Sequence, residues 1–245
     1  MTTPHPNLPP QGGKELTARF KADSPMFREI VAFRRSPQFD DRFRHDLRQL
    51  LRWRRDVRRF RTDPIPDALV EELLDLACLA PSVGNAQPWR FVSVDDAGNR
   101  AAIVANYNEA NARALAGYQG ERAQLYASLK LAGLKEAPRH LAVFCDEETA
   151  QGHGLGRQTM PETLRYSAVL AVHTLWLAAR TRGVGVGWVS ILDPVAATRQ
   201  LQVPPHWSLV AYLCLGWPVE EQDEPELQRA GWQARDAACR QVLQR

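Results

Sequence analysis

The sequence has no closely spaced pair of cysteines. Its four cysteines, Cys78, Cys145, Cys214 and Cys239, lie far apart and form no CxxC motif. Zinc-ligand spacing and a disulfide framework are therefore not indicated. Three of the four fall in apolar stretches, where a free cysteine behaves as a small hydrophobe. We interpret them as core residues of a protein in a reducing compartment.

A long apolar run is also missing. The most apolar long stretch, residues 167–179, is far shorter than a membrane span and is followed by Arg180 and Arg182. Residues 1–14 carry four prolines and two glycines but no apolar run, so they do not resemble a signal peptide. We therefore expect a soluble, cytoplasmic protein.

Several motifs of metal, hydrolase and nucleotide chemistry are absent. The six histidines show no paired spacing, so we predict no metal site. No Ser-His-Asp order with an elbow motif occurs. The glycines of residues 183–187 do not follow the GxGxxG pattern with a helix after it. A net charge of +3 without a nucleic-acid motif does not favour a nucleic-acid partner.

The composition that remains is that of a globular domain. Of the 245 residues, 44% are hydrophobic and 24% are charged. Residues 1–38 are dominated by proline, glycine and scattered charge, and we expect a disordered or extended leader there. Residues 39–245 are then one domain, which ends in a polar C-terminal arm.

Hydrophobic periodicity predicts an alternation of helices and strands. The expected helices cover residues 40–53, 67–77, 100–116, 121–135, 161–181 and 194–201, and the expected strands cover residues 89–94, 141–145, 184–191 and 208–215. Asp67 is a plausible N-cap. The long connections favour an α+β sheet covered by helices. The helix over residues 161–181 is apolar nearly all round and must be buried on every side, so we expect it in an intertwined homodimer.

Arginine is concentrated near the start of the domain. Residues 42–61 contain nine arginines and no lysine, and arginine forms bidentate, planar contacts with phosphates that lysine cannot form. We call residues 54–59 (RRDVRR) the arginine cluster. It could clamp two phosphate oxygens; from the residues alone, a solvated basic helix face is the more common explanation of such a run. Asp56 inside the cluster either pairs with an arginine or lies beside a ligand, with its pKa lowered by the positive charge.

Two further segments could contact a ligand. Residues 80–89 (APSVGNAQPW) offer a hydroxyl, two amides and close backbone access to the polar edge of a flat ligand; an ordinary helix-to-strand connection is the alternative. Residues 183–194 (GVGVGWVSILDP) alternate glycine with apolar residues, and glycine inside a strand often marks close approach of a ligand or another backbone. Ser190 is either a satisfied polar residue or a donor to a bound ring.

Taken together, these segments resemble the nitroreductase superfamily and, within it, the 5,6-dimethylbenzimidazole synthase (BluB) family. The stretches that carry the resemblance are RRDVRRF (54–60), APSVG (80–84) with QPW (87–89), GER (120–122) with YASLKL (126–131), MPET (160–163), LWLAAR (175–180), GVGWVSILDP (185–194) and YLCLGWP (212–218). They cover roughly residues 50–235, and GWVSILDP is the most diagnostic.

The resemblance implies a homodimeric α+β fold, a nitroreductase-like central sheet covered by helices, with FMN at the subunit interface. It implies that molecular oxygen fragments reduced FMN to 5,6-dimethylbenzimidazole, the lower ligand of vitamin B12, and erythrose 4-phosphate. The flavin is then a substrate, supplied by an external flavin reductase. Such oxygen chemistry needs a dry, small site, and residues 118–134 have the composition of a helical lid that could seal it.

By motif, the resemblance links Asp56 and Ser190 to catalysis, Asp56 as a candidate general base and Ser190 as a hydrogen-bond partner of the flavin. The candidate cofactor-binding residues are Arg54, Arg55, Arg58, Ser82, Gly84, Gln87, Ile191, Leu192, Gly216 and Arg235.

Two other functions fit the same segments. One is an NAD(P)H-dependent nitroreductase or flavin reductase that recycles FMN, and the other is a non-catalytic FMN-binding protein. The sequence departs from the family pattern at His173-Thr174 in the long helix and at Ala132 in the predicted lid, and residues 1–38 have no family counterpart. None of these departures touches Asp56 or Ser190.

Overall fold

A computed structural model describes residues 36–129 and 133–245 of the chain. Most of the predicted leader, residues 1–35, therefore lies outside the described residues, and so does part of the predicted lid, residues 130–132. Residues 39–245 form one unit, which contains all of the helices and strands described here.

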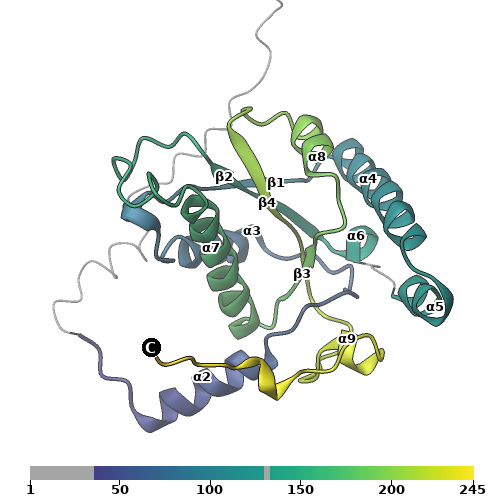
Figure 1. The fold of residues 1–245 in the computed structure, drawn as a ribbon, viewed down its shortest axis with the longest axis horizontal. Helices are drawn as coiled ribbons and strands as arrows, with labels where there is room; N and C mark the ends of the chain where they lie inside the picture. Colours follow the sequence, from purple (N-terminus) through teal and green to yellow (C-terminus); the bar gives the residue numbers. More distant parts are fainter. Residues whose placement is uncertain (1–35, 130–132) are drawn as a thin grey trace, which may run out of the picture. The chain divides into compact units, whose positions relative to one another are not determined.

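A four-stranded antiparallel sheet is the centre of the unit (Figure 1). Its order is β1-β2-β4-β3, with β1 at Trp89–Ser93, β2 at Arg139–Asp146, β3 at Gly185–Val189 and β4 at Trp207–Gly216. All four predicted strands are present within a few residues of the expected ends. Helices lie between consecutive strands in the chain, and the predicted α+β class is confirmed.

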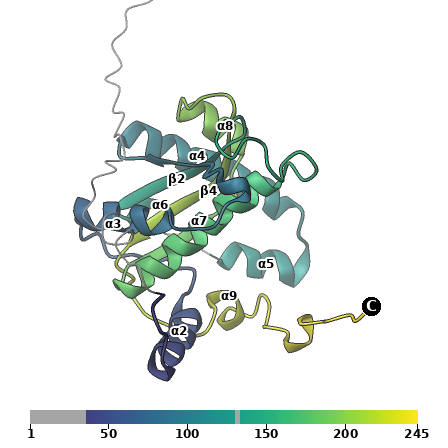
Figure 2. The ribbon, with the colours of Figure 1, turned by 90° about the vertical axis from the view of Figure 1, so that its left-hand side faces the viewer.

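The helices cover both faces of the sheet (Figures 1 and 2). They are α2 (Asp41–Trp53), α3 (Asp67–Ala77), α4 (Ala97–Ala116), α5 (Gly120–Ser128), α6 (Gly133–Glu136), α7 (Thr163–Thr181), α8 (Pro194–Gln200) and α9 (Glu226–Arg229), with 3-10 turns η1 (Val83–Asn85) and η2 (Ala237–Cys239). The single helix expected over residues 121–135 differs from the structure, because α5 ends at Ser128 and α6 begins at Gly133.

Alternation along β2 and β4 sorts the core into two layers, since successive strand residues point to opposite faces. Leu141 and Leu213 pack with α3 and α7 on one face. Ala142 and Tyr212 pack with α4 and α8 on the other. Two of the predicted core cysteines, Cys145 and Cys214, are fully buried, whereas Cys78 is only partly so.

The arginine cluster runs beside the edge strand β3. Asp56 forms a parallel bridge with Val186, and Phe60 forms an antiparallel bridge with Pro218. A Cβ atom on Gly187 would overlap the carbonyl oxygen of Val57, and one on Gly185 would lie 2.9 Å from the Val57 side chain. The glycine alternation of β3 therefore marks close approach of another backbone, one of the two readings that the sequence allowed.

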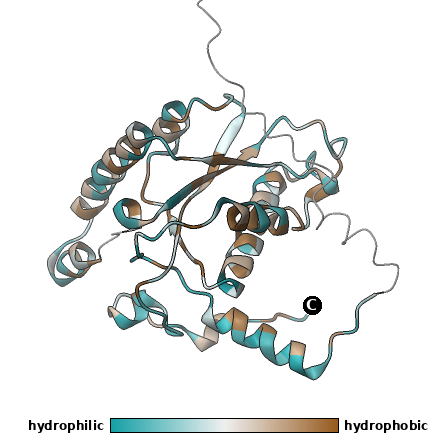
Figure 3. Cartoon of the chain, turned by 180° about the vertical axis from the view of Figure 1, so that it is seen from behind, coloured by the Kyte–Doolittle hydropathy of each residue, from teal (hydrophilic) through white to brown (hydrophobic). Residues whose placement is uncertain are grey.

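Apolar side chains of α2 and α7 remain exposed on this unit. On α2 these are Phe43, Leu47, Leu51 and Trp53, and on α7 they are Tyr166, Val169 and Leu170. In Figure 3, the α2 ribbon at the lower right is mostly hydrophilic and carries several hydrophobic residues. The expectation that α7 is buried on every side is thus not met within one chain. Its other face packs on the sheet through Val172 and Leu175.

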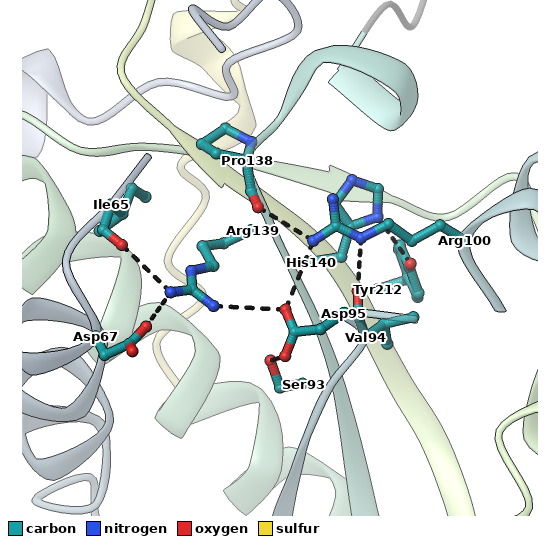
Figure 4. Close-up of polar contacts among 10 residues, drawn as sticks. All are labelled: Ile65, Asp67, Ser93, Val94, Asp95, Arg100, Pro138, Arg139, His140 and Tyr212. Atoms are coloured by element: carbon teal, nitrogen blue, oxygen red, sulfur yellow. Dashed lines mark hydrogen bonds and ion pairs between the residues drawn. The ribbon is translucent and has the colours of Figure 1, made fainter. Parts of the chain in front are cut away.

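A polar network ties α3 and α4 to β1 and β2 (Figure 4). Arg139 pairs with Asp67 and reaches Asp95 Oδ1 at 3.5 Å. Arg100 Nε donates to Val94 O at 2.7 Å. The prediction of Asp67 as an N-cap is wrong. The helix is capped at Pro66 with no side-chain hydrogen bond, and the Asp67 carboxylate serves the ion pair instead.

The buried pair beside this network makes a pH-dependent contribution to stability. His140 Nδ1 lies 2.9 Å from the Tyr212 hydroxyl, and burial, aided by Arg100, lowers the pKa of His140 to about 4. Between pH 6.5 and 4, His140 is protonated in the unfolded chain but stays neutral in the folded protein. Its contribution to the free energy of unfolding is therefore fully present above pH 6.5 and is lost as the pH falls toward 4. The loss from this group is on the order of 3 kcal/mol.

Urea unfolding between pH 7.5 and 4.5 should show this loss in the wild type. In His140→Gln, which keeps a polar partner for Tyr212, the free energy of unfolding should fall less steeply with pH. The matched control is His153→Asn, in an exposed loop. It should keep the wild-type pH dependence, which shows that the effect requires the buried histidine and not merely the loss of one histidine. An unchanged slope in His140→Gln would contradict the assignment.

Candidate functional site

The arginine cluster lines a solvent-open hollow at the C-terminal end of α2. Its other walls are Trp176 and Arg180 of α7, the start of β3, and residues 220–226 (EEQDEPE), which we call the acidic segment. The acidic segment follows β4 and lies across the cluster because Val219 N donates to Arg59 O at 3.2 Å. Charges of both signs therefore meet around one open space.

The acidic segment provides carboxylate or carbonyl partners for several of the neighbouring arginines. Arg55 donates to the Asp223 carbonyl through Nε at 2.8 Å and Nη2 at 2.6 Å. Arg180 forms a bidentate pair with Glu221 at 2.7 and 2.9 Å. In two further pairs, Arg52 contacts Asp223 at 2.6 Å and Arg59 contacts Glu220. These guanidinium groups already have partners.

Arg54 and Arg235 are different. Within the described part of the chain, neither side chain has a hydrogen bond or an ion pair. They lie close enough that Arg235 contributes to lowering the pKa of Arg54, after the larger effect of burial and against the pull of Asp56. Burial and then Arg235 also lower the pKa of Arg55. Two neighbouring guanidinium groups whose N–H donors are unpaired among the described residues are suited to binding an anion.

Asp56 lines the hollow, and its carboxylate is bound by two groups. Its Oδ1 accepts from Trp188 N at 2.9 Å, and its Oδ2 accepts from Arg58 Nε at 3.3 Å. Burial raises the pKa of Asp56, and the Trp188 N–H and Arg58 only partly oppose this. The expectation that surrounding positive charge lowers this pKa is therefore wrong, because desolvation outweighs it. A carboxylate with a raised pKa is better suited to exchanging a proton near neutral pH.

Ser190 lies just past the end of β3, two residues after the strand residue that binds Asp56. Its side chain is exposed and has no hydrogen-bond partner among the residues that the structure describes. Two residues along a strand span about 7 Å, so the backbone of Ser190 lies about that far along the chain from Trp188, whose N–H binds the Asp56 carboxylate. Asn106 of α4 fixes the segment that follows, accepting from Asp193 N at 2.8 Å and donating to Asp193 O at 3.0 Å.

The loop with Ser82, Gly84 and Gln87 lies elsewhere on the chain. Ser82 Oγ accepts from Gln87 N at 3.1 Å, and Val83 N donates to Ser167 Oγ at 3.0 Å, near the N-terminus of α7. Gly84 has a φ of +55° and a Cβ there would meet Leu155 O at 2.9 Å. Trp176, at the arginine cluster, is nine residues further along α7, or about 14 Å at 1.5 Å per residue. One chain therefore does not bring this loop to the arginines.

The remaining predicted contacts have visible packing roles. Ile191 and Leu192 are half-buried, and Leu192 packs against the core layer under α4 and α8. A Cβ on Gly216 would lie 2.8 Å from Phe60 and from Pro138, so this glycine lets the end of the arginine cluster close onto β4. None of the three lines the hollow of the arginine cluster.

Part of the predicted lid contacts the C-terminal arm. Tyr118 and Tyr126 stack with ring centroids 4.8 Å apart, and Trp232 meets Tyr118 edge-on at 5.5 Å. Arg122 of α5 lies over the Trp232 ring at 4.7 Å and donates to its carbonyl at 3.0 Å. Arg235 follows three residues later. The helix proposed as a lid thus touches the arm that carries a candidate phosphate contact.

Sequence reasoning missed two residues of this site. Trp176 stacks on Arg54 at 4.7 Å from the ring centroid, and Asn106 orders the backbone after Ser190. Trp176 belongs to the segment LWLAAR, which contributed to the family resemblance but indicated no role for the tryptophan. Asn106 lies in an alanine- and asparagine-rich helix where nothing distinguishes it from its neighbours.

In the described part of the chain, no group of three or more His, Cys, Asp or Glu side chains could hold a metal ion. No helix of residues 36–129 or 133–245 has the length and apolar character to cross a membrane.

Comparison with known proteins gives consistent matches. The profile of the nitroreductase family matches residues 51–217. The 5,6-dimethylbenzimidazole synthase of Rhodospirillum rubrum is 61% identical over 202 residues, 82% of this chain and 96% of that protein. That of Rhodobacter capsulatus is 52% identical over 195 residues, 80% of this chain and 94% of that protein. A solved structure of iodotyrosine deiodinase bound to FMN and 3-iodo-L-tyrosine has a TM-score of 0.64 and 26% identity, and covers 81% of this chain and 97% of that one.

Proposed function

The chain belongs to the nitroreductase family and, within it, to the 5,6-dimethylbenzimidazole synthases, and we propose that it makes 5,6-dimethylbenzimidazole by oxygen-dependent fragmentation of reduced FMN. The likeness to the two curated synthases over most of both chains carries this conclusion. Erythrose 4-phosphate is the second product of the proposed reaction. An NAD(P)H-dependent reductase and a passive flavin-binding protein are the alternatives that the experiment below separates.

The donor set of the hollow fits the phosphate end of FMN. Arg54 and Arg235 offer two guanidinium groups without a carboxylate partner in the described structure. Arg58 donates from Nε to Asp56. Its two terminal nitrogens have no partner among the described residues and can donate to a ligand. Arg55 is already bound to Asp223 O, so we assign it to holding the acidic segment in place. Charge-assisted hydrogen bonds of this kind are short and strong.

Asp56 and Ser190 are the residues that we assign to proton handling. Reduced FMN supplies the ring that is broken and the electrons that oxygen accepts. Asp56 is fixed by Trp188 N and Arg58, so its carboxylate is oriented before any substrate arrives. Its raised pKa favours its acting as a general base. The Ser190 hydroxyl, which has no hydrogen-bond partner among the described residues, is assigned to a flavin nitrogen or oxygen.

We propose that the working enzyme is a homodimer with FMN between the subunits. The loop with Ser82 and Gln87 and the arginine cluster lie at opposite ends of α7, and the face of α7 with Tyr166, Val169 and Leu170 is exposed. A second copy could cover this face and bring its own Ser82 loop to the arginines of the first. Contiguous exposed apolar patches of this kind mark protein interaction sites.

Leu170→Glu tests this arrangement. A carboxylate in the apolar face should shift the protein to monomer in sedimentation velocity and weaken FMN binding, because burying an unpaired charge is costly. Val195→Glu is the matched control, since Val195 is 65% exposed on α8, on the other side of the sheet. A Leu170→Glu dimer with wild-type affinity would remove α7 from the interface.

The proposed reaction is tested with purified protein and excess chemically reduced FMN in air. Mass spectrometry should find 5,6-dimethylbenzimidazole. Turnover of NADH with a nitroaromatic and no such product would support a reductase, and bound but intact FMN would support a passive carrier. Oxygen as co-substrate is checked by repeating the incubation without air. A separate flavin reductase and a cytoplasmic location are part of the proposal.

A further inference from the structure

We infer that Trp176 is a positioning residue that holds Arg54 in the geometry needed to bind the phosphate group of a flavin nucleotide. The inference rests on the proposed FMN site and assigns a role to a residue that the predicted site did not contain. Trp176 lies on α7, 121 residues from Arg55, whose carbonyl oxygen accepts a hydrogen bond from its indole N–H. Only the tertiary fold brings Trp176 to the arginine cluster.

Arg54 is the member of the arginine cluster with the fewest polar restraints. Arg55 is fixed by three hydrogen bonds to carbonyl oxygens, Arg58 by Asp56 and Arg59 by Glu220. Arg54 has no such partner among the described residues. A free arginine side chain has about 2 kcal/mol of rotamer entropy to lose when it binds a ligand.

Trp176 provides the missing restraint in two ways. Its ring lies under the Arg54 guanidinium with 4.7 Å from Cζ to the ring centroid, and tryptophan is the best aromatic partner for a cation. Its indole N–H donates to Arg55 O at 3.2 Å, which fixes the backbone immediately after Arg54. The Trp188 ring packs beside the Trp176 ring, with 6.3 Å between the ring centroids. Stacking uses the guanidinium face and leaves its edge, with the N–H donors, free for an anion.

The position of this pair explains why stacking suits the site better than an ion pair. A carboxylate hydrogen-bonded to Arg54 would compete with the ligand phosphate for the same N–H donors. The acidic segment reaches Arg52, Arg55 and Arg59 but makes no bond to Arg54 in the described structure. An aromatic face orients the cation without neutralising it.

The test is equilibrium binding of oxidised FMN and of riboflavin, which differ only in the phosphate. Trp176→Leu should weaken FMN binding about tenfold, in line with a partly desolvated cation–π contact. Riboflavin binding should stay within twofold, because the ring contacts remain. Trp176→Phe keeps a smaller aromatic face and loses the indole N–H, so its FMN affinity should fall between those of wild type and Trp176→Leu.

A double-mutant cycle with Arg54→Ala shows whether Trp176 acts through Arg54. Arg54→Ala should lower FMN affinity by roughly 10- to 100-fold. Trp176→Leu should then add less than a twofold loss in the Arg54→Ala background, whereas an independent structural role would give additive losses. Trp217→Leu is the matched control. Trp217 packs on the same core layer and donates to Pro64 O at 3.3 Å, but none of the described arginines stacks on it.

Equal loss of FMN and riboflavin binding in Trp176→Leu would overturn the inference, as would additive losses in the cycle or wild-type FMN affinity. A wild-type protein that binds both flavins equally would overturn the phosphate grip itself and this inference with it. Absence of 5,6-dimethylbenzimidazole with these binding results intact would count against the proposed reaction alone.

Discussion

Asp56→Asn is expected to bind flavin and to form almost no 5,6-dimethylbenzimidazole. The amide oxygen can still accept from Trp188 N, which the Asp56 carboxylate contacts at 2.9 Å, so the local structure should survive. What disappears is the proton acceptor. Loss of a general base typically lowers a rate by about 10²- to 10⁴-fold. Product formed in a single turnover with reduced FMN measures the effect directly, and FMN titration shows that the site is intact.

Asp63→Asn is a suitable control. Asp63 is exposed and pairs with Arg61 in the same part of the chain, outside the hollow. Its removal should leave product formation within twofold, because exposed ion pairs contribute about 0–1 kcal/mol. Retained product formation in Asp56→Asn would remove Asp56 from the mechanism, whatever its effect on binding.

Gly187→Ala is expected to disrupt the site through packing alone. A Cβ at this position overlaps the Val57 carbonyl oxygen, which belongs to backbone and cannot rotate away. The segment from Asp56 to Phe60 would have to leave β3, breaking the Val57 N to Val186 O bond of 3.1 Å and the Asp56 to Trp188 bond. We expect a loss of about 3 kcal/mol, at the upper end of overpacking effects, and a Tm lower by about 6–12 °C.

Thermal unfolding and FMN titration measure both consequences. Gly117→Ala is the matched control, because Gly117 ends α4 with a φ of −80° and its nearest neighbour to an added Cβ, Ala114 O, is 3.3 Å away. Alanine is favoured over glycine in helical conformations, so its Tm should be unchanged or slightly higher. If Gly187→Ala keeps the wild-type Tm and FMN affinity, the close approach of these two backbones is not needed for the site.

The secondary structure was largely predictable because its signals are local. Alternating or helical spacing of apolar residues marks which face of a segment is buried, and this requires only the neighbours in sequence. The four strands and the helix ending in Thr181 were therefore predicted within a few residues. The interruption after Ser128 was not, since no proline marks it.

The direction of the Asp56 pKa shift could not be predicted from the cluster alone. The sequence shows four arginines around one carboxylate, which suggests a lowered pKa. Burial against β3 reverses the sign, and burial depends on where the chain folds. The same holds for Asp67, which the sequence indicates as a cap and which the fold uses to pair with Arg139 from β2.

The sequence by itself determined the family resemblance and the α+β class, and it predicted the candidate site groups Asp56, Ser190 and the arginine cluster. The tertiary structure decided which of these candidate groups have partners within the chain. It gave carbonyl or carboxylate partners to Arg55 and Arg59, left Arg54 stacked on Trp176, and set the Ser82 loop about 14 Å away along α7. The physical reason is that a side chain's partners come from distant segments. Local sequence fixes which groups are present, and only packing fixes which of them meet.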